Sequence, residues 1–163
     1  MRRRMQNRPF RPADAEALTH VFYDAVHQVA AQYYSPEQIA AWVPERPPAE
    51  RYLARGADGR LILVAADEAD RPVAYVDLEA DGHIDHLFCR PEQAGRGVTG
   101  ALYAALEAEA RARGLSRLYV EASEPAKRFF LRQGFSVVTR RDFEVRGVPI
   151  HNWAMEKRLD APA

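Results

Sequence analysis

Cysteine is almost absent from this 163-residue chain, and its scarcity limits the kinds of site that the chain can build. A single cysteine, Cys89, excludes a disulfide within the chain and a zinc site made of cysteines. No apolar run approaches the roughly 20 residues that a membrane-spanning helix needs, and the basic start is not followed by the apolar stretch of a signal peptide. We therefore expect a cytoplasmic protein with no membrane partner and no metal.

A net charge is also lacking, because 23 lysines and arginines balance 23 aspartates and glutamates. This balance argues against nucleic acid as a partner, since nucleic-acid-binding domains are typically strongly basic. The first eleven residues nevertheless hold basic residues and no acidic one: Arg2, Arg3, Arg4, Arg8 and Arg11. We interpret residues 1–7 as a disordered basic tail, with an anion-binding arm as the alternative, and residues 8–159 as a single domain.

Hydrophobic periodicity predicts helices and strands that alternate along the chain. Helical spacing is expected over 15–29, 36–43, 49–55, 98–113 and 125–132, and strands over 8–12, 61–66, 73–79, 84–89, 118–122, 135–145 and 148–155. This order predicts an α+β fold with a mixed, mostly antiparallel sheet of six to seven strands and flanking helices. One right-handed βαβ crossover, between the strands that begin at Ile84 and Leu118, is expected at the centre of the sheet.

A glycine-rich loop over residues 94–100 joins the strand that ends at Cys89 to the following helix. Glycines let the backbone approach a ligand, and the free N–H groups at a helix start favour an anion such as a pyrophosphate. The sequence GRGVTG also fits the dinucleotide fingerprint, with Glu121 at a later strand end, so a nicotinamide dinucleotide-binding protein is a remote alternative. We disfavour it because that fold needs repeated βαβ units in a doubly wound sheet.

Two segments together resemble the GNAT family of acetyl-CoA-dependent N-acetyltransferases. They are residues 87–99 (LFCRPEQAGRGVT) with the helix that follows, and residues 126–135 (AKRFFLRQGF). Residues 34–42 (YSPEQIAAW) and 84–89 (IDHLFC) resemble the YafP-like branch of that family. The resemblance implies a GNAT-like fold and transfer of acetyl from acetyl-CoA to an amine of a small molecule or peptide, by direct attack in a ternary complex.

The resemblance also implies how the chain would hold the cofactor. Backbone N–H groups of the loop would bind the pyrophosphate of CoA, and the two central strands would splay apart around the pantetheine arm. An N–H near Leu87, Phe88 or Cys89 would polarise the thioester carbonyl. The implied cofactor-binding residues are Leu87, Phe88, Cys89, Ala94, Gly95, Arg96, Gly97, Val98, Thr99, Gly100, Ser123 and Phe130.

Three departures from the family pattern bear on these assignments. The first loop position is Ala94, whose methyl group cannot hydrogen-bond a phosphate. Thr99 stands where glycine or alanine is usual. Phe130 occupies the place of a tyrosine that often protonates the departing thiolate. The last departure favours the alternative function, a CoA-binding or regulatory module without catalysis.

An amine with a pKa near ~10.4 must lose a proton before it attacks, so the transfer requires a base. Our candidates are Asp85 first, His83 second and Glu121 third, because a carboxylate and a histidine inside an apolar strand are costly unless paired or useful. The alternatives are a hydrogen-bonded structural acid at Asp85, a partly exposed histidine at His83 and a solvated acid at Glu121. Cys89 has apolar neighbours, so we interpret its side chain as a small buried hydrophobe rather than a nucleophile.

The resemblance places an acceptor-binding rim on the first two helices and on the last strand. The residues of this rim are Tyr33, Tyr34, Trp42 and Asn152, which would select an aromatic or apolar acceptor; core packing is the alternative. The pattern is also compatible with a homodimer formed through the last strands.

Overall fold

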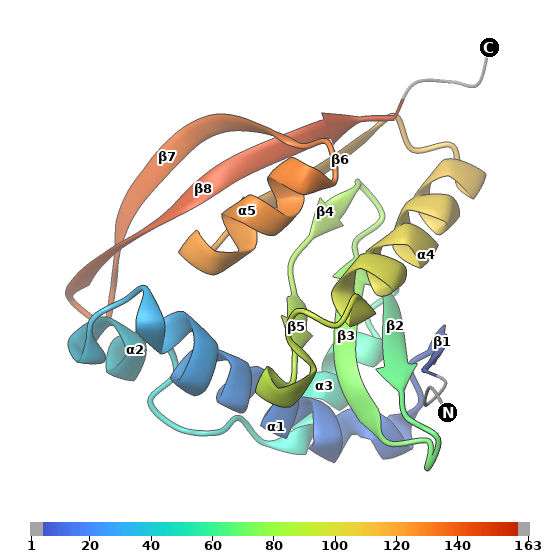
Figure 1. Ribbon diagram of the computed structural model, residues 1–163, viewed down its shortest axis with the longest axis horizontal. Coiled ribbons are helices and arrows are strands. Elements are labelled where there is room, and N and C mark those ends of the chain that lie inside the picture. The colour runs from blue at the N-terminus through green and yellow to red at the C-terminus, as the bar shows by residue number, and fades with distance from the viewer. Residues whose placement is uncertain (1–4, 160–163) are drawn as a thin grey trace.

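Two four-stranded sheets meet in the middle of the computed structural model, which describes residues 5–159 (Figure 1). The first sheet is antiparallel throughout, in the order β1 (Gln6–Pro9), β2 (Leu61–Ala66), β3 (Pro72–Leu78) and β5 (Leu87–Cys89). The second has the order β4 (His83–Ile84), β6 (Arg117–Ala122), β8 (Val148–Arg158) and β7 (Ser136–Val145). Only β4 and β6 pair in parallel, as the two ends of a crossover through one helix.

The helices begin and end close to where the sequence predicts them. They are η1 (Pro12–Asp14), α1 (Ala15–Asp24), α2 (Pro36–Trp42), α3 (Ala49–Gly56), η4 (Pro91–Gln93), α4 (Val98–Ala112) and α5 (Glu124–Arg132). A π-helical segment, η2 (Ala25–Val29), and a 3-10 turn, η3 (Ala30–Gln32), extend α1. A capping box opens α2, because Ser35 Oγ accepts from Gln38 N–H at 3.1 Å and the Gln38 side chain accepts from Ser35 N–H at 2.8 Å.

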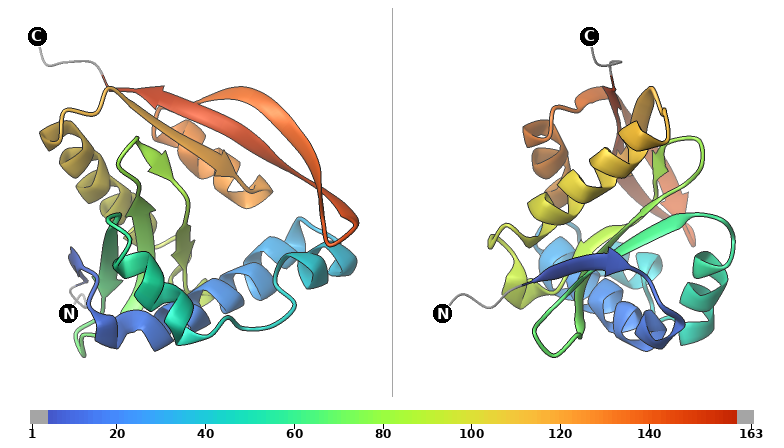
Figure 2. Two further views of the ribbon diagram at one scale, coloured as in Figure 1. Left: turned by 180° about the vertical axis from the view of Figure 1, so that it is seen from behind. Right: turned by 90° about the vertical axis from the view of Figure 1, so that its right-hand side faces the viewer.

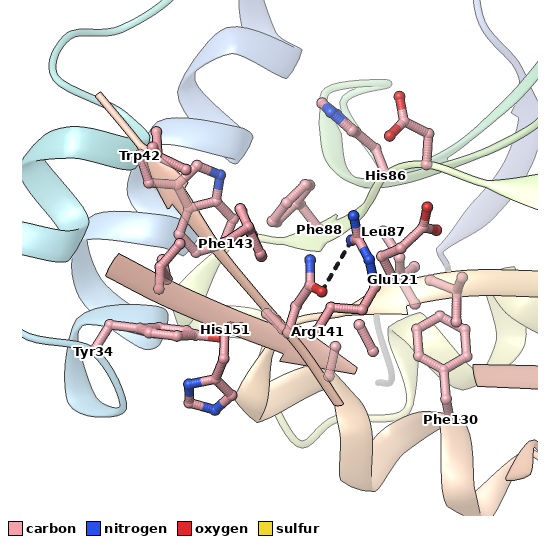
Figure 3. Close-up of a pocket in the computed structure, with 18 of the residues that line it drawn as sticks. Tyr34, Trp42, His86, Leu87, Phe88, Glu121, Phe130, Arg141, Phe143 and His151 are labelled. Atoms are coloured by element: carbon pink, nitrogen blue, oxygen red, sulfur yellow. Dashed lines mark hydrogen bonds between the residues drawn. The ribbon is translucent and has the colours of Figure 1, made fainter. Parts of the chain in front are cut away.

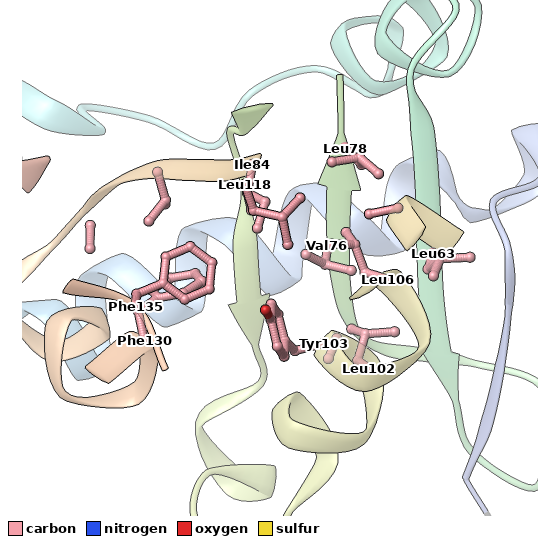
Figure 4. Close-up of a cluster of buried hydrophobic side chains, with 14 of the residues drawn as sticks. Leu63, Val76, Leu78, Ile84, Leu102, Tyr103, Leu106, Leu118, Phe130 and Phe135 are labelled. Atoms are coloured by element: carbon pink, nitrogen blue, oxygen red, sulfur yellow. The ribbon is translucent and has the colours of Figure 1, made fainter. Parts of the chain in front are cut away.

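The first sheet is covered by helices on both faces, and each face packs into its own hydrophobic core. Figure 2 shows α1 and α3 on one side of β2 and β3, with α4 on the other. Side chains of β2 alternate accordingly: Leu63 packs in one core with Leu102 and Leu106 of α4, and Val64 packs in the other with Leu18 of α1. The α4 core continues to Phe130 and Phe135 beside the second sheet (Figure 4). This packing fixes the edge of the first sheet that faces the second.

The predicted strand 84–89 is not continuous, which corrects our expectation. Its first part is β4, which pairs with β6 at His83 and Ile84, and its second part is β5, which pairs only with β3. Between them the N–H groups of Asp85 and His86 donate to Asp77 Oδ1 at 2.8 and 2.9 Å, so a buried carboxylate replaces a strand partner. A continuous strand would place residues 83, 85, 87 and 89 on one face, and the kink breaks this alternation.

The α+β architecture with one central crossover, β4–α4–β6, is confirmed, but the expected single sheet is divided in two. The strand β1 also begins earlier than predicted: Gln6 and Asn7 pair with Ala66 and Ala65, so they do not belong to a tail. The rest of the expected tail lies largely outside the described residues. Arg8 is buried and pairs with Asp14 at 2.8 Å, which is a structural use of one of the N-terminal arginines.

Candidate functional site

A cavity of about 350 Å³ lies where the two sheets part (Figure 3). Three parts of the chain line it, besides Phe22, Tyr34 and Trp42 of the N-terminal helices. The kink and β5 contribute His83, Asp85, His86, Leu87 and Phe88; β6 and the start of α5 contribute Val120, Glu121, Ala122, Ser123, Ala126 and Phe130. The β7–β8 hairpin contributes Arg141, Phe143, Val145, Ile150, His151 and Asn152. The cavity therefore brings together all three candidate bases.

His83 lies between two carboxylates at the parallel junction of β4 and β6. Its Nε2 is 2.7 Å from Glu121 Oε2 and its Nδ1 is 2.9 Å from Glu79 Oε1. Burial alone would lower the pKa of His83, but the hydrogen bonds to Glu79 and Glu121 outweigh it, so the pKa is raised. A histidine that holds its proton this firmly is better suited to orient Glu121 than to act as a base.

Asp85, the first candidate base, is engaged by two arginines. Its Oδ2 accepts from Arg55 at 2.8 Å and from Arg60 at 3.4 Å, and both arginines also pair with the buried carboxylate of Asp77. Burial would raise the pKa of Asp85, yet the neighbouring His86 and the hydrogen bond and charge of Arg55 lower it. This environment matches the alternative of a hydrogen-bonded structural acid.

His86 lines the same cavity, and the search for candidate bases in the sequence missed it. Its Nδ1 is 2.9 Å from the Tyr75 hydroxyl, which is 2.5 Å from the Tyr52 hydroxyl. The His86 ring stacks on Phe22 and meets the edge of Phe88, with ring centroids 5.2 Å apart in both cases. Burial lowers the pKa of His86 to about 4, so this ring is neutral near pH 7. The sequence signal was the adjacent pair Asp85-His86 in an apolar strand.

The glycine loop lies outside the cavity lining and opens α4. Gly97 is the N-cap of α4 with a φ of +80°, and Gly95 has a φ of +77°, so both adopt the left-handed conformation that favours glycine. A Cβ at Gly97 would meet no heavy atom within 4 Å, which means that the loop surface is open. The N–H groups of Val98, Thr99 and Gly100 belong to the first turn, where a helix offers them no acceptor of its own. No side chain caps the helix in its place.

The edge of β5 that faces away from β3 connects this loop with the cavity. The His86 carbonyl accepts from Asp77 N–H at 3.1 Å, and Arg90 N–H donates to the Val73 carbonyl at 2.8 Å. Because antiparallel pairing uses alternate residues, the backbone of Phe88 is directed to β3 and the N–H groups of Leu87 and Cys89 are directed to the gap. Burial raises the pKa of the Cys89 thiol to about 11, in keeping with a thiol that is not a nucleophile.

Two of the expected rim residues on the helices line the cavity, and one does not. Tyr34 is buried, and its hydroxyl donates to the His151 carbonyl at 3.0 Å and accepts from Glu124 N–H at 2.8 Å, which ties η3 to β8 and α5. Tyr33 is 54% exposed and does not line the cavity, because adjacent residues of this turn point in different directions. Asn152 lies in the lining, next to Arg141, which was not among the expected residues.

Residues 5–159 contain neither a membrane-spanning helix nor a cluster of metal-binding side chains. No helix in this part of the chain is long and apolar enough to span a membrane. No group of three or more histidine, cysteine, aspartate or glutamate side chains is arranged to hold a metal ion in the same part.

Comparison with known proteins places this geometry in a family. A family model described as an acetyltransferase (GNAT) domain matches residues 30–158. The chain is 36% identical over 151 residues to the N-acetyltransferase YafP of Escherichia coli K12, which is described as uncharacterized, and the match covers 93% of this chain and 94% of the relative.

Solved structures give the same result. A GCN5-related N-acetyltransferase from Rhodopseudomonas palustris superposes with a TM-score of 0.87 at 34% identity, covering 98% of this chain and 99% of the other. YncA from Salmonella typhimurium, solved with acetyl-CoA, superposes with a TM-score of 0.76 at 22% identity, covering 98% and 96%. The family match over most of the chain, together with these likenesses, shows that the protein belongs to the GNAT family and is an N-acetyltransferase.

Proposed function

We propose that the protein transfers acetyl from acetyl-CoA to an amine of a small molecule or peptide, by direct attack within a ternary complex. The observation that carries this proposal is that β5 and β6 lie in different sheets and do not pair, with the open start of α4 following β5 and the carboxylate of Glu121 on β6. Acetyl-CoA supplies an activated acetyl thioester to the gap between these strands.

The chain has suitable groups for both ends of the cofactor. The free N–H groups of Val98, Thr99 and Gly100 point out of the first turn of α4, where the helix dipole favours a diphosphate. At the other end, the N–H groups of Leu87 and Cys89 are the donors available along β5 to a carbonyl oxygen in the gap. Donors placed in this way stabilise the negative charge that develops on such an oxygen.

Glu121 is the base that the geometry favours, ahead of Asp85 and His83. One oxygen of Glu121 is 2.7 Å from His83 Nε2, and the other is left to take the proton that the attacking nitrogen loses, directly or through a water molecule. Asp85 is held by Arg55 and Arg60, and a lowered pKa makes it a weaker proton acceptor. His83 then acts as a positioning residue for Glu121.

The non-catalytic module is the second candidate function, and Phe130 is the observation that favours it. Phe130 lines the cavity without a hydroxyl, so its side chain cannot protonate a departing thiolate. A thiol with a pKa near ~8.5 is nevertheless a good leaving group that water can protonate, so the loss of the tyrosine does not prevent transfer.

The release of free thiol from acetyl-CoA separates the two functions. The protein is mixed with acetyl-CoA and a panel of amines, amino acids and short peptides, and each N-acetyl product is identified by mass spectrometry. We expect thiol release that depends on an acceptor and equals the product formed. Tight CoA binding with no turnover on any acceptor would instead establish the non-catalytic module.

A further inference from the structure

Arg141 is the one cationic side chain of the cavity lining that has no acidic partner among the residues described. Its Nη1 donates to Asn152 Oδ1 at 3.1 Å, and its guanidinium lies 5.3 Å from the centroid of the Phe143 ring. Both partners are neutral, so the positive charge of Arg141 is oriented by its neighbours but not neutralised by them.

The other charged side chains of the cavity lining each have a partner of opposite charge. Glu121 is paired with His83, and Asp85 is paired with Arg55 and Arg60. His151, next to Asn152 on β8, has its Nε2 2.7 Å from Glu124 Oε2. Arg141 is therefore the charge for which a ligand would supply the counterion.

The sheet register places Arg141 and Glu121 on one face. Glu121 is opposite Ala154 of β8, Asn152 lies two residues from Ala154 on that same face, and Arg141 is opposite Asn152. The Arg141 backbone is thus two strands and two residues from that of Glu121, about 12 Å away. Both side chains lie in the lining of one cavity (Figure 3), so a molecule with an amine and an anionic group can contact the two together.

We infer that the acetyl acceptor is a small amine that also carries a carboxylate, with Arg141 and Asn152 binding the carboxylate while Glu121 receives the amine. This inference rests on the proposed function. A guanidinium binds a carboxylate through two parallel hydrogen bonds, which fixes the orientation as well as the position of the ligand.

The cavity also limits the rest of the acceptor. Its volume of about 350 Å³ is at the small end for ligand sites, and the acetyl group must share it. Aromatic side chains line another part of the cavity: Phe22, Trp42, Phe88 and Phe143. A free amino acid with an apolar side chain fits this description, and an internal residue of a protein, which lacks a carboxylate beside its amine, does not.

Phenylalanine, phenylalaninamide and phenethylamine test the role of the carboxylate, because they differ only at that group. We expect kcat/KM of the wild-type protein to be about 10- to 100-fold higher for phenylalanine than for the other two, which is the usual worth of a charge-assisted hydrogen bond. Arg141→Gln is expected to remove this preference by lowering kcat/KM for phenylalanine alone. Arg141→Lys is expected to restore part of it.

Arg140→Gln is the matched control, because Arg140 precedes Arg141 on β7, points to the opposite face and is paired with Asp142 at 3.1 Å. The preference should persist in this variant. Equal kcat/KM for phenylalanine and its amide in the wild-type protein, or an equal loss for both compounds in Arg141→Gln, would overturn the inference.

A binding measurement separates a failure of this inference from a failure of the proposed function. If no acceptor is acetylated, the proposed function fails, and the same three compounds are titrated calorimetrically into the protein saturated with CoA. Binding of phenylalanine that is lost in Arg141→Gln and kept in Arg140→Gln would still support the carboxylate site. No binding of phenylalanine, or equal affinity for the acid and the amide, would refute it.

Discussion

The Nε2 atom of His83 lies 2.7 Å from Oε2 of Glu121, where β4 and β6 form their short parallel pairing. The pair stands at the point where the two sheets begin to separate, and its Glu121 side faces the cavity. A second carboxylate, Glu79, holds the other nitrogen of His83. The histidine therefore holds one oxygen of Glu121, and the other is the one that our proposal assigns to the incoming amine.

Glu121→Gln should lower kcat by about 100-fold, because general-base catalysis contributes on that order or more. The affinity for CoA should change little, since Glu121 is not part of the loop at α4. Steady-state kinetics and CoA titration measure the two quantities. The matched control is Glu109→Gln on the exposed side of α4, which is expected to be fully active. A Glu121→Gln variant with wild-type kcat would remove Glu121 as the base.

Gly97→Asp should weaken CoA binding by about 100-fold or more, because it places a negative charge beside the expected diphosphate and strains the left-handed backbone that opens α4. Gly59→Asp is the control, since Gly59 also has a positive φ, +96°, and equally open surroundings, but precedes β2 outside the cavity lining. Calorimetric titration with CoA measures both variants. Equal affinities in the two variants would refute the assignment of the loop.

Asp77→Asn should lower the free energy of unfolding by about 3 kcal/mol, because it removes the buried carboxylate that Arg55 and Arg60 share and leaves them only more exposed acidic partners. Urea unfolding measures the change. Asp142→Asn, at an exposed ion pair of β7, should cost less than about 1 kcal/mol. A loss in Asp77→Asn as small as that of the control would mean that the carboxylate does not hold the kink between β4 and β5.

The buried His86 should make stability depend on pH between about 4 and 6.5. Its pKa is lowered to about 4, so in this range the unfolded chain binds a proton that the folded chain does not. The contribution of His86 to stability is therefore complete above the unfolded pKa and is lost as pH falls toward 4, by about 3 kcal/mol in total. Unfolding of the wild-type protein and of His86→Asn at several pH values measures this. The same pH slope in both proteins would contradict the prediction.

Cys89→Ala should keep wild-type kcat, because the pKa of the thiol, raised by burial to about 11, leaves almost no thiolate at neutral pH. Iodoacetamide should accordingly react slowly with the folded wild-type protein. A folded Cys89→Ala variant without activity would point to a covalent acetyl-cysteine intermediate, in place of direct attack.

Features that depend on nearby residues could be predicted from the sequence. The caps of α2, the glycine at the start of α4 and the alternation in β6 are local, so their elements begin and end close to where they were expected. The division between β4 and β5 was not predictable in this way. It depends on the carboxylate of Asp77 on β3, which takes the N–H groups of Asp85 and His86 in place of a strand.

The site could be predicted where a motif or an unusual residue marked it. Glu121, His83 and Asp85 stood out as charged residues in apolar strands, and they do meet in one cavity. Which of them is engaged by arginines depends on Arg55 at the end of α3 and Arg60, which no spacing connects to Asp85. Arg141 gave no signal, because one arginine on an exposed strand of an arginine-rich chain looks like any other.

The proposed acetyl transfer requires a cofactor that lies along the free edge of β5, with its diphosphate at the start of α4. A crystal structure of the protein grown with CoA tests this most directly. We predict diphosphate oxygens within hydrogen-bond distance of the N–H groups of Val98, Thr99 and Gly100, and a pantetheine arm between β5 and β6. Density for CoA elsewhere, or β5 and β6 paired along their length with the loop N–H groups unused, would contradict the account.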